Sequence, residues 1–461
     1  MLAVRKIRPD RGLDLEELPV PEPGPEDCLV YVEAASICGT DVHIWNWDRW
    51  SQRRIKPPLT LGHEFCGTIV AVGDKVRHAQ AGDYVSAESH VTCGMCYQCR
   101  TGQAHMCPNT QILGVDRDGA FANYVVVPEK VIWHNNRAKL PPEIATLQEP
   151  FGNAVFATMN QDMSGESVAV LGCGPIGLFT IAIAKAVGAK AVFASDINPF
   201  RIHLARVMGA TEVFNPAEGE PRTSVRADLR SHEGTKPEPR GTEARRHEGT
   251  KGRNEEPKGN IETTPLTPPL PRGDTGGYGN VETGIRNPQS AIRNAEAESA
   301  IRTSGDGDAD IVSRVVEANG GYGVDIVMEM SGAAAAITTA FRVVRNGGTV
   351  VLFGIPAKPV EIDVAENMIF KNLTVRALNG RRIFDTWYKT RWLLEGGVVD
   401  LKPLITKTIG FQEINDAVAM LSRGDACKIV LLPNGGKPPA LPEPRRLRAP
   451  RPNITGAPVH R

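Results

Sequence analysis

The chain has 461 residues, which is enough for two or three domains with separate cores. Its 53 basic side chains balance 53 acidic ones, so composition gives no electrostatic case for binding nucleic acid or an anionic membrane. No apolar run approaches the roughly 20 residues that span a bilayer, and the first residues lack the apolar stretch of a signal peptide. We therefore expect a cytoplasmic protein.

The first part of the chain, to about residue 150, alternates short apolar runs with turn residues. Typical runs are residues 28–32 and 67–73. Short strands at such spacing indicate a mostly antiparallel β domain, which we place at residues 1–152.

From about residue 153 the pattern changes, and apolar strand-like runs alternate with helical stretches. The strand-like runs are residues 167–171, 191–196, 324–330, 348–354 and 373–377. This alternation is typical of βαβ units and a parallel sheet. We expect a doubly wound α/β domain over residues 153–379, and we expect residues 380–432 to complete the first domain.

Residues 216–309 interrupt this pattern with a segment rich in Gly, Pro, Glu, Arg and Thr. A short sequence at residues 232–236 recurs at 247–251. Such a composition cannot bury enough apolar surface to offset chain entropy, so we predict a disordered insertion in a surface loop. A partner-binding segment is the alternative. The Pro/Arg-rich residues 433–461 are predicted to be a disordered tail.

Four cysteines lie within one short stretch: Cys93, Cys96, Cys99 and Cys107. In a reducing compartment, this spacing indicates metal binding rather than disulfides. Four thiolates complete a tetrahedral shell and leave no position open for a substrate, so we predict a structural zinc site. An iron–sulfur cluster is the alternative, although a compact loop inside a β domain favours zinc.

Cys38, His63 and Glu64 combine a thiolate, an imidazole and a carboxylate. This set suits zinc, and three protein ligands leave a fourth position open for chemistry. Taken singly, Cys38 is equally consistent with a small buried hydrophobe and His63 with a core histidine. Thr40 and His43 follow Cys38 closely and are residue types that carry a proton.

Gly172, Gly174 and Gly177 form a Gly-x-Gly-x-x-Gly motif between a predicted strand and a predicted helix. This context indicates a dinucleotide-binding turn, where glycines let the backbone approach a pyrophosphate at a helix N-terminus. Asp196, about 20 residues further on, is placed to accept hydrogen bonds from the adenosine ribose and to repel a 2′-phosphate. NAD is therefore predicted in preference to NADP. Arg201 is either a contact for the adenosine end or a solvated surface charge.

Glu149 lies at the change of domain, just before Pro150. We expect its carboxylate to face the cleft between the domains, as a zinc ligand or as part of a proton relay. A surface glutamate before a turn is the alternative. His90, just before the cysteine cluster, is a candidate for substrate contact in the same cleft, and a structural role fits its position equally well.

Together these motifs resemble the zinc-containing medium-chain alcohol dehydrogenase superfamily. The resemblance covers residues 1–215 and 310–432. It rests on residues 37–52, 62–64, 150–155 and 386–389 and on the four-cysteine cluster. The segment that carries Trp45, Trp47 and Trp50 is similar to the branch of this superfamily that oxidises L-threonine.

The resemblance implies a GroES-like catalytic domain followed by a Rossmann domain that binds NAD. It implies two zinc ions per chain, a catalytic one on Cys38, His63 and Glu64 and a structural one on the cysteine cluster. It also implies a proton relay through Thr40 and His43.

In the same superfamily, the position of Glu149 lies close to the catalytic zinc, as ligand or relay. The NAD contacts implied by the resemblance are Ile176, Asp196, Arg201, Phe353, Gly354, Ile355, Leu378 and Asn379. Family members are usually homotetramers. Two positions depart from the family pattern: Phe156 stands where histidine is common, and Asn379 where tyrosine is often found.

The implied activity is NAD-dependent oxidation of the small-molecule substrate L-threonine to L-2-amino-3-oxobutanoate, with zinc as the Lewis acid. A polyol or secondary-alcohol dehydrogenase of the same superfamily is the nearest alternative. A non-catalytic NAD-binding scaffold is the alternative from another class.

Overall fold

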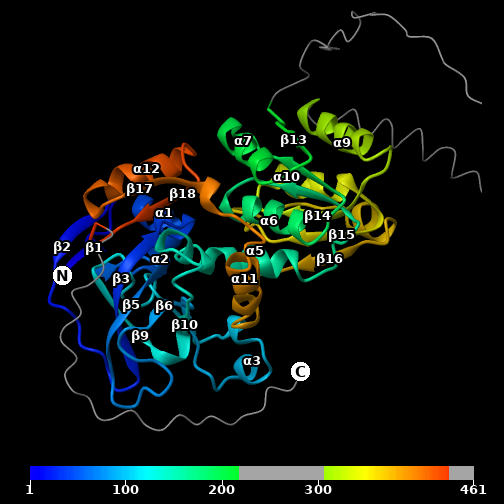
Figure 1. Ribbon diagram of the computed structural model, residues 1–461. Helices are drawn as coiled ribbons and strands as arrows, with labels where there is room; N and C mark the ends of the chain where they lie inside the picture. Colours follow the sequence, from blue (N-terminus) through cyan, green and yellow to red (C-terminus); the bar gives the residue numbers. More distant parts are fainter. Residues whose placement is uncertain (218–305, 436–461) are drawn as a thin grey trace, which may run out of the picture. The chain divides into compact units, whose positions relative to one another are not determined.

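A computed structural model describes residues 1–217 and 306–435 (Figure 1). Most of the predicted insertion at 216–309 and of the predicted tail at 433–461 lies outside these described residues. Both predictions therefore stay predictions.

The first domain is built mostly on antiparallel strands, although β17 pairs with β18 in parallel. Their bounds are β1 Leu2–Lys6, β2 Asp14–Glu17, β3 Asp27–Ser36, β4 Leu59–Thr60, β5 Glu64–Val72, β6 Tyr84–Ala87, β7 His90–Val91, β8 Gln111–Ile112, β9 Tyr124–Pro128, β10 Ile132–His134, β17 Ile405–Ile409 and β18 Lys428–Leu431. The main sheet has the order β10-β6-β5-β3-β18-β17, with β9 also paired to β3. A smaller sheet has the order β2-β1-β4, and β7 pairs with β8.

The last two strands join the first ones in this main sheet. Val430 and Leu431 of β18 pair antiparallel with Ser36 and Ala35 of β3. In Figure 1 the red and orange strands of the chain's end accordingly lie beside the blue strands of its start. The C-terminal strands are thus positioned to contribute side chains to a site formed at the end of β3.

Short helices connect or cover these strands. Their bounds are α1 Gly39–Asn46, α2 Arg49–Arg54, α3 Tyr97–Arg100, α4 Pro142–Ala145, α5 Gln148–Thr158, α11 Asp385–Glu395 and α12 Ile414–Arg423, with single turns η1 Ala104–Met106, η2 Glu129–Val131, η4 Lys402–Leu404 and η5 Phe411–Glu413. α5 packs on both α11 and α6, so it lies where the two domains meet.

The second domain is a parallel six-stranded sheet with helices. The elements are β11 Ser167–Leu171, α6 Pro175–Ala186, β12 Ala191–Ser195, α7 Pro199–Val207, β13 Glu212–Phe214, α9 Asp306–Ala318, β14 Val324–Glu329, α10 Ala334–Val343, β15 Val344–Leu352, η3 Ala365–Ile369 and β16 Thr374–Ala377. The strand order is β13-β12-β11-β14-β15-β16. The chain therefore reverses its direction across the sheet between β11 and β14, the position where such sheets bind ligands.

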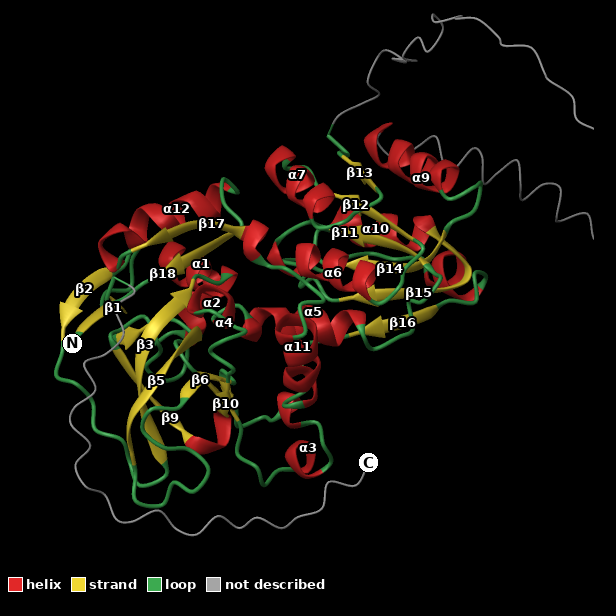
Figure 2. Ribbon diagram, in the orientation of Figure 1, coloured by secondary structure: helices red, strands yellow, loops and turns green. Residues whose placement is uncertain are grey.

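Both faces of this sheet are buried, as Figure 2 shows by the helices on either side of it. Val168 and Val170 of β11 pack into a core with α5 and α6, whereas Ala169 and Leu171 pack into a second core with α9 and α10. A strand buried on both faces is read as a continuous apolar run, which is the pattern that predicted it. The predicted fold class, an antiparallel β domain with a doubly wound α/β domain, is confirmed.

Candidate active site

The register of two strands brings Cys38, His63 and Glu64 together. Cys38 follows the end of β3 and Glu64 begins β5, and Ser36 pairs directly with Glu64 across the sheet. One ligand atom from each of the three residues lies within 4.8 Å of the others. The end of one strand and the start of its antiparallel neighbour thus form one cluster from two separate sequence segments.

This cluster is polar and buried. His63 is 5% exposed and Glu64 is 0% exposed. Among the described residues, Nδ1 of His63 and Oε1 of Glu64 have no hydrogen-bond partner. An unpaired buried carboxylate oxygen is costly, and a bound cation removes that cost. The unpaired oxygen and the thiolate–imidazole–carboxylate donor set therefore fit a zinc ion.

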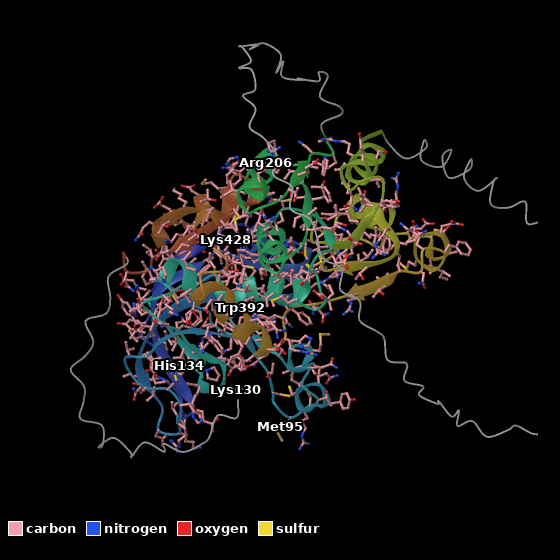
Figure 3. The ribbon with its side chains drawn as sticks, turned by 45° about the vertical axis from the view of Figure 1, so that its right-hand side comes forward. Met95, Lys130, His134, Arg206, Trp392 and Lys428 are labelled. Atoms are coloured by element: carbon pink, nitrogen blue, oxygen red, sulfur yellow. The ribbon has the colours of Figure 1, made fainter. Side chains whose placement is uncertain are left out.

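The other carboxylate oxygen of Glu64 is held by the protein. Lys428 of β18, labelled in Figure 3, places its Nζ 2.5 Å from Oε2 of Glu64 and donates to the carbonyl of Ile37 at 2.9 Å. The hydroxyl of Ser36 donates to the same Oε2. Although burial alone would lower it, the pKa of Lys428 is raised by the Glu64 carboxylate and the Cys38 thiolate. Oε2 is thus committed, and Oε1 is left for a metal.

A second carboxylate, Asp41, lies beneath the same cluster. One of its oxygens accepts the backbone N–H of Cys38 at 2.9 Å, and the other has no partner among the described residues. Burial raises the pKa of Asp41 to about 6, against the opposing charge of His63. Asp41 is therefore a second buried carboxylate at the cluster, and it fixes the backbone of Cys38 at the start of α1.

Thr40 and His43 lie three residues apart on α1, on one face of the helix. Oγ1 of Thr40 is 3.8 Å from Sγ of Cys38. Nδ1 of His43 is 2.5 Å from Oδ2 of Asp48. Asp48 is the N-cap of α2, and its Oδ1 accepts the backbone N–H of Ser51. The turn between the two helices requires Trp47 in the left-handed conformation, with φ at 53°. With Nδ1–H donated to a carboxylate, Nε2 of His43 is the free acceptor.

Glu149 of α5 is buried, at 5% exposed, rather than on the surface. It accepts a hydrogen bond from Ser89 Oγ at 2.6 Å and lies 2.8 Å from Nη2 of Arg381. Burial alone would raise its pKa, but the charges of Arg381 and His63 hold that pKa below its ordinary value. His90 reaches the same network, because its Nδ1 is 3.0 Å from both Ser89 Oγ and Glu88 Oε1.

The four predicted zinc cysteines form a separate lobe. Their Sγ atoms are 3.4 Å apart for Cys96–Cys99, 3.5 Å for Cys93–Cys107, 3.7 Å for Cys96–Cys107 and 4.0 Å for Cys93–Cys99. A tetrahedral zinc with bonds of about 2.3 Å requires sulfur–sulfur distances of roughly 3.8 Å, so this lobe fits the ion. Backbone N–H groups of Met95 and Cys96 lower the pKa of Cys93 to about 6, which favours the ligating thiolate.

The glycine motif follows β11 at the point where the strand order reverses. Gly172 has φ at +96°, and a Cβ there would lie 2.6 Å from Cβ of Ser331. A Cβ on Gly177 would lie 1.9 Å from the carbonyl oxygen of Gly172, so the turn and the start of α6 pack too closely for a side chain. At Gly174, the N-cap of α6, a Cβ would meet nothing within 4 Å. The open N-terminus of a helix of twelve residues fits a pyrophosphate.

Asp196 lies next to this turn, directly after β12. Its Oδ2 accepts the backbone N–H of Cys173 at 2.7 Å, and its Oδ1 accepts that of Asn198 at 2.8 Å. Nη1 of Arg201 is 3.9 Å from Oδ2. Asp196 is therefore rigidly oriented beside the glycine turn, and Arg201 is near enough to bind the same ligand.

The remaining predicted cofactor contacts lie along the same edge of the sheet. Ile176 is on α6; Phe353, Gly354 and Ile355 follow β15; Leu378 and Asn379 follow β16. Carboxyl ends of neighbouring parallel strands meet at one edge, so the topology brings these segments to the glycine turn. Phe156, which stands where histidine is common in the family, packs edge-on against His105 of the cysteine lobe, with ring centroids 5.5 Å apart.

Sequence reasoning missed five polar residues that hold the site together: Asp41, Asp48, Glu88, Arg381 and Lys428. Asp41 and Asp48 had a signal, because each lies within the segment of Cys38 to Trp50. Lys428 had none, since it lies 364 residues from its partner Glu64.

The described residues include no helix long and apolar enough to cross a membrane. With two metal-ligand clusters and a dinucleotide turn, the fold and the site define a zinc-dependent dehydrogenase. Two family profiles agree: the alcohol dehydrogenase GroES-like domain matches residues 24–137, and the zinc-binding dehydrogenase matches residues 175–236 and 286–395.

Relatives with similar sequences support the same class of enzyme. An L-threonine 3-dehydrogenase from Symbiobacterium thermophilum is 37% identical over 435 residues, which covers 94% of this chain and 98% of that protein. One from Bacillus subtilis is 35% identical and covers 92% and 95%. The chain therefore belongs to the zinc-containing medium-chain alcohol dehydrogenase superfamily and is a zinc-dependent alcohol dehydrogenase.

Solved structures show the same fold. A putative zinc-binding dehydrogenase from Sinorhizobium meliloti 1021, bound to NADP, is 26% identical with a TM-score of 0.67 and covers 94% of this chain and 99% of its own. Alcohol dehydrogenase TADH from Thermus sp. ATN1 is 24% identical with a TM-score of 0.68 and the same coverage. The GroES-like domain followed by a Rossmann sheet, as the resemblance implied, is therefore confirmed.

Proposed function

We propose that this enzyme oxidises the β-hydroxyl of L-threonine to a ketone, giving L-2-amino-3-oxobutanoate, with NAD as hydride acceptor. The observation that carries the proposal is the set of L-threonine 3-dehydrogenases at 35–37% identity over nearly the whole chain. The candidate site supports the proposal, because α1 begins at the Cys38, His63 and Glu64 cluster and carries the exposed imidazole of His43. The homologues alone supply the choice of threonine among alcohols.

Two zinc ions fit the chain, one on Cys38, His63 and Glu64 and one on the cysteine lobe. At the first site, a bound zinc supplies Lewis acidity that makes a substrate hydroxyl easier to deprotonate. The protein keeps Oε1 of Glu64 free for this ion while Lys428 and Ser36 hold Oε2. The lobe has no position left for a substrate, so its role is structural.

The proton leaves through α1. Thr40 lies beside the ligand Cys38. Its hydroxyl would accept the proton of the substrate hydroxyl while it passes its own proton on. One turn further along the helix, Nε2 of His43 takes that proton on towards solvent, since the His43 side chain is 62% exposed. Asp48 fixes the ring by its contact with Nδ1. Glu149, held by Ser89 and Arg381, contributes negative charge beside the site.

NAD is the proposed cofactor because of Asp196. Its carboxylate is fixed beside the glycine turn by two backbone N–H groups, where it can accept bonds from a ribose and repels a 2′-phosphate. Arg201 lies within 3.9 Å of that carboxylate, so its charge is partly neutralised by Asp196. A cofactor supplies the hydride acceptor that the chain's own side chains lack.

The decisive assay compares NADH formation from L-threonine, sorbitol and 2,3-butanediol by the zinc-loaded protein, each with NAD and with NADP. We expect kcat/KM to be highest for L-threonine with NAD, by about tenfold or more, which corresponds to roughly 1.4 kcal/mol. A strong preference for a polyol would contradict the threonine proposal and leave the dehydrogenase class standing.

Assembly and compartment belong to the proposal too. The resemblance points to a homotetramer in the cytoplasm. A solution mass of four chains by light scattering would support the assembly, and a monomer that is fully active would contradict it.

A further inference from the structure

Arg381 is a buried arginine that bridges two carboxylates next to the candidate metal centre. Its side chain is 1% exposed. Nε donates to Oε2 of Glu88 at 2.8 Å, and Nη2 lies 2.5 Å from Oε1 of Glu88. The same Nη2 is 2.8 Å from Oε1 of Glu149. One guanidinium thus holds two buried carboxylates from different elements.

The surrounding residues are arranged to keep this guanidinium in place. A Cβ on Gly152 of α5 would lie 2.9 Å from Cδ of Arg381, so only glycine leaves room for the arginine stem. Trp387 of α11 donates its indole N–H to Oε2 of Glu88 at 2.8 Å. Ser89 accepts from Arg381 at 3.0 Å and donates to Glu149 at 2.6 Å. Oε1 of Glu149 therefore has two donors that fix its direction.

This network lies next to the predicted ligands of the catalytic metal. Thr146, one turn before Glu149, donates its hydroxyl to the backbone carbonyl of Glu64 at 2.9 Å, so the start of α5 lies against this metal ligand. Glu149 and Arg381 are both buried, and the charge of Glu149 acts on His63. Yet the group of donor atoms within 4.8 Å of one another contains Cys38, His63 and Glu64 and excludes Glu149. A second carboxylate thus lies near the open metal position and is turned towards an arginine.

We propose that Arg381 is a positioning residue that holds the Glu149 carboxylate beside the catalytic metal and off it, so that the fourth metal position stays open for the substrate. Without this arginine, the buried Glu149 carboxylate loses its counter-charge, and a cation is its natural partner. Arg381 also follows Leu378 and Asn379 closely in sequence. Its contact with Glu149 therefore connects the segment after β16 to α5. The role in turnover rests on the proposed function, whereas the role at the metal does not.

The test uses the full-length protein with Co²⁺ in place of Zn²⁺, because the visible absorption of Co²⁺ reports its coordination. Spectra are taken without substrate for the wild type, Arg381→Met, Glu149→Gln and the double variant. We expect Arg381→Met to shift the bands of the Cys38 site as the Glu149 carboxylate joins the ion. In the double variant, the neutral amide should leave the bands as in Glu149→Gln. An unchanged spectrum in Arg381→Met, or a shift that persists in the double variant, overturns the proposal.

Arg137→Met is the matched control. Arg137 makes a similar two-pronged contact with the buried Glu33, at 2.8 and 2.6 Å, away from the metal ligands. We expect this variant to keep the wild-type spectrum and a kcat within about twofold. Its side chain is 49% exposed, against 1% for Arg381. A band shift of equal size in Arg137→Met would show that loss of any forked arginine–glutamate contact disturbs the site.

If Arg381→Met does not fold, Arg381→Lys carries the test, since it keeps the charge but not the forked contact. We expect kcat to fall by about tenfold, with KM for the alcohol changed less than threefold, and we expect this loss to vanish in a Glu149→Gln background. Independent, additive losses overturn the proposal. Failure of the threonine proposal alone would show as wild-type inactivity on L-threonine, and the cobalt spectra would still decide the role of Arg381.

Discussion

The four-cysteine lobe takes its ligands from one loop of residues 93–107, whereas the Cys38 centre takes its ligands from the ends of β3 and β5. In the lobe, backbone N–H groups of the same loop stabilise the Cys93 thiolate. In the Cys38 centre, the counter-charge comes from Lys428 of β18 and is itself buried. The lobe is thus self-contained, and the other centre depends on the register of a whole sheet.

This difference explains what each centre is suited for. Four thiolates that close on one ion leave no room for a ligand, and a local loop requires only the metal to fold. The Cys38 centre keeps one carboxylate oxygen unpaired and uses the rest of the domain to hold the other. An open position therefore requires support from far away in sequence, and variants in the two centres should behave differently.

Cys38→Ser should have the largest effect on activity. Loss of the thiolate removes one of three ligands, and we expect turnover to fall by about a thousandfold or more. Metal analysis should fall from about two zinc ions per chain to about one, with NAD binding unchanged. As a control, Cys28→Ala removes a buried thiol outside both clusters and should keep both ions. Near-normal turnover in Cys38→Ser would refute the catalytic assignment.

Lys428→Met should have the largest effect on stability. This substitution leaves the buried Glu64 carboxylate without its counter-charge. Breaking a buried ion pair in this way costs about 3–5 kcal/mol. Because a bound cation also compensates Glu64, we expect the loss to be greater after treatment with a chelator than in the zinc-loaded protein. Thermal unfolding of both forms measures this difference.

Lys190→Met is the matched control for that experiment. Lys190 lies 3.2 Å from Asp325, but its side chain is 54% exposed. We expect a loss below about 1 kcal/mol that does not depend on metal. If the two lysine variants respond to chelator equally, Lys428 does not act on the metal centre.

Cys96→Ser should affect stability more than chemistry. The lobe then loses its ion, and with it a local share of the folding free energy of about 1–3 kcal/mol. We expect kcat at low temperature to stay within about threefold of the wild type, while the melting temperature falls by several degrees. A loss of turnover as deep as that of Cys38→Ser, in protein that remains folded, would contradict the division of roles.

The same contrast decides how much the sequence could predict. The lobe could be identified from its spacing alone, and the strands of the parallel sheet from apolar runs, because these signals are local. The three-residue strand β13 has too short a pattern to detect. Arg381 and Lys428 lie 293 and 364 residues from their partners Glu88 and Glu64. No spacing rule in the sequence connects these residues to their partners, because only the fold brings them together.

Asp48→Asn should have the smallest effect, and it tests the relay rather than the metal. Partial burial would raise the pKa of Asp48, but bonds from Ser51 and His43 hold it below its ordinary value. Asparagine keeps the cap of α2, so the fold should stay intact. The imidazole of His43 then loses the carboxylate that accepts from its Nδ1 and orients its ring, so kcat should fall about fivefold while KM changes little.

Ser51→Ala separates that effect from a change in α2. Ser51 contacts the other oxygen of Asp48 through its hydroxyl at 3.1 Å, and its backbone N–H remains in the variant. We expect this variant to keep the wild-type kcat, because Oδ2 still accepts from His43. If Ser51→Ala lowers kcat as far as Asp48→Asn does, the Asp48 carboxylate acts through the helix and not through the imidazole. In that case the relay, like the Cys38 centre, would depend on the surrounding fold rather than on one local contact.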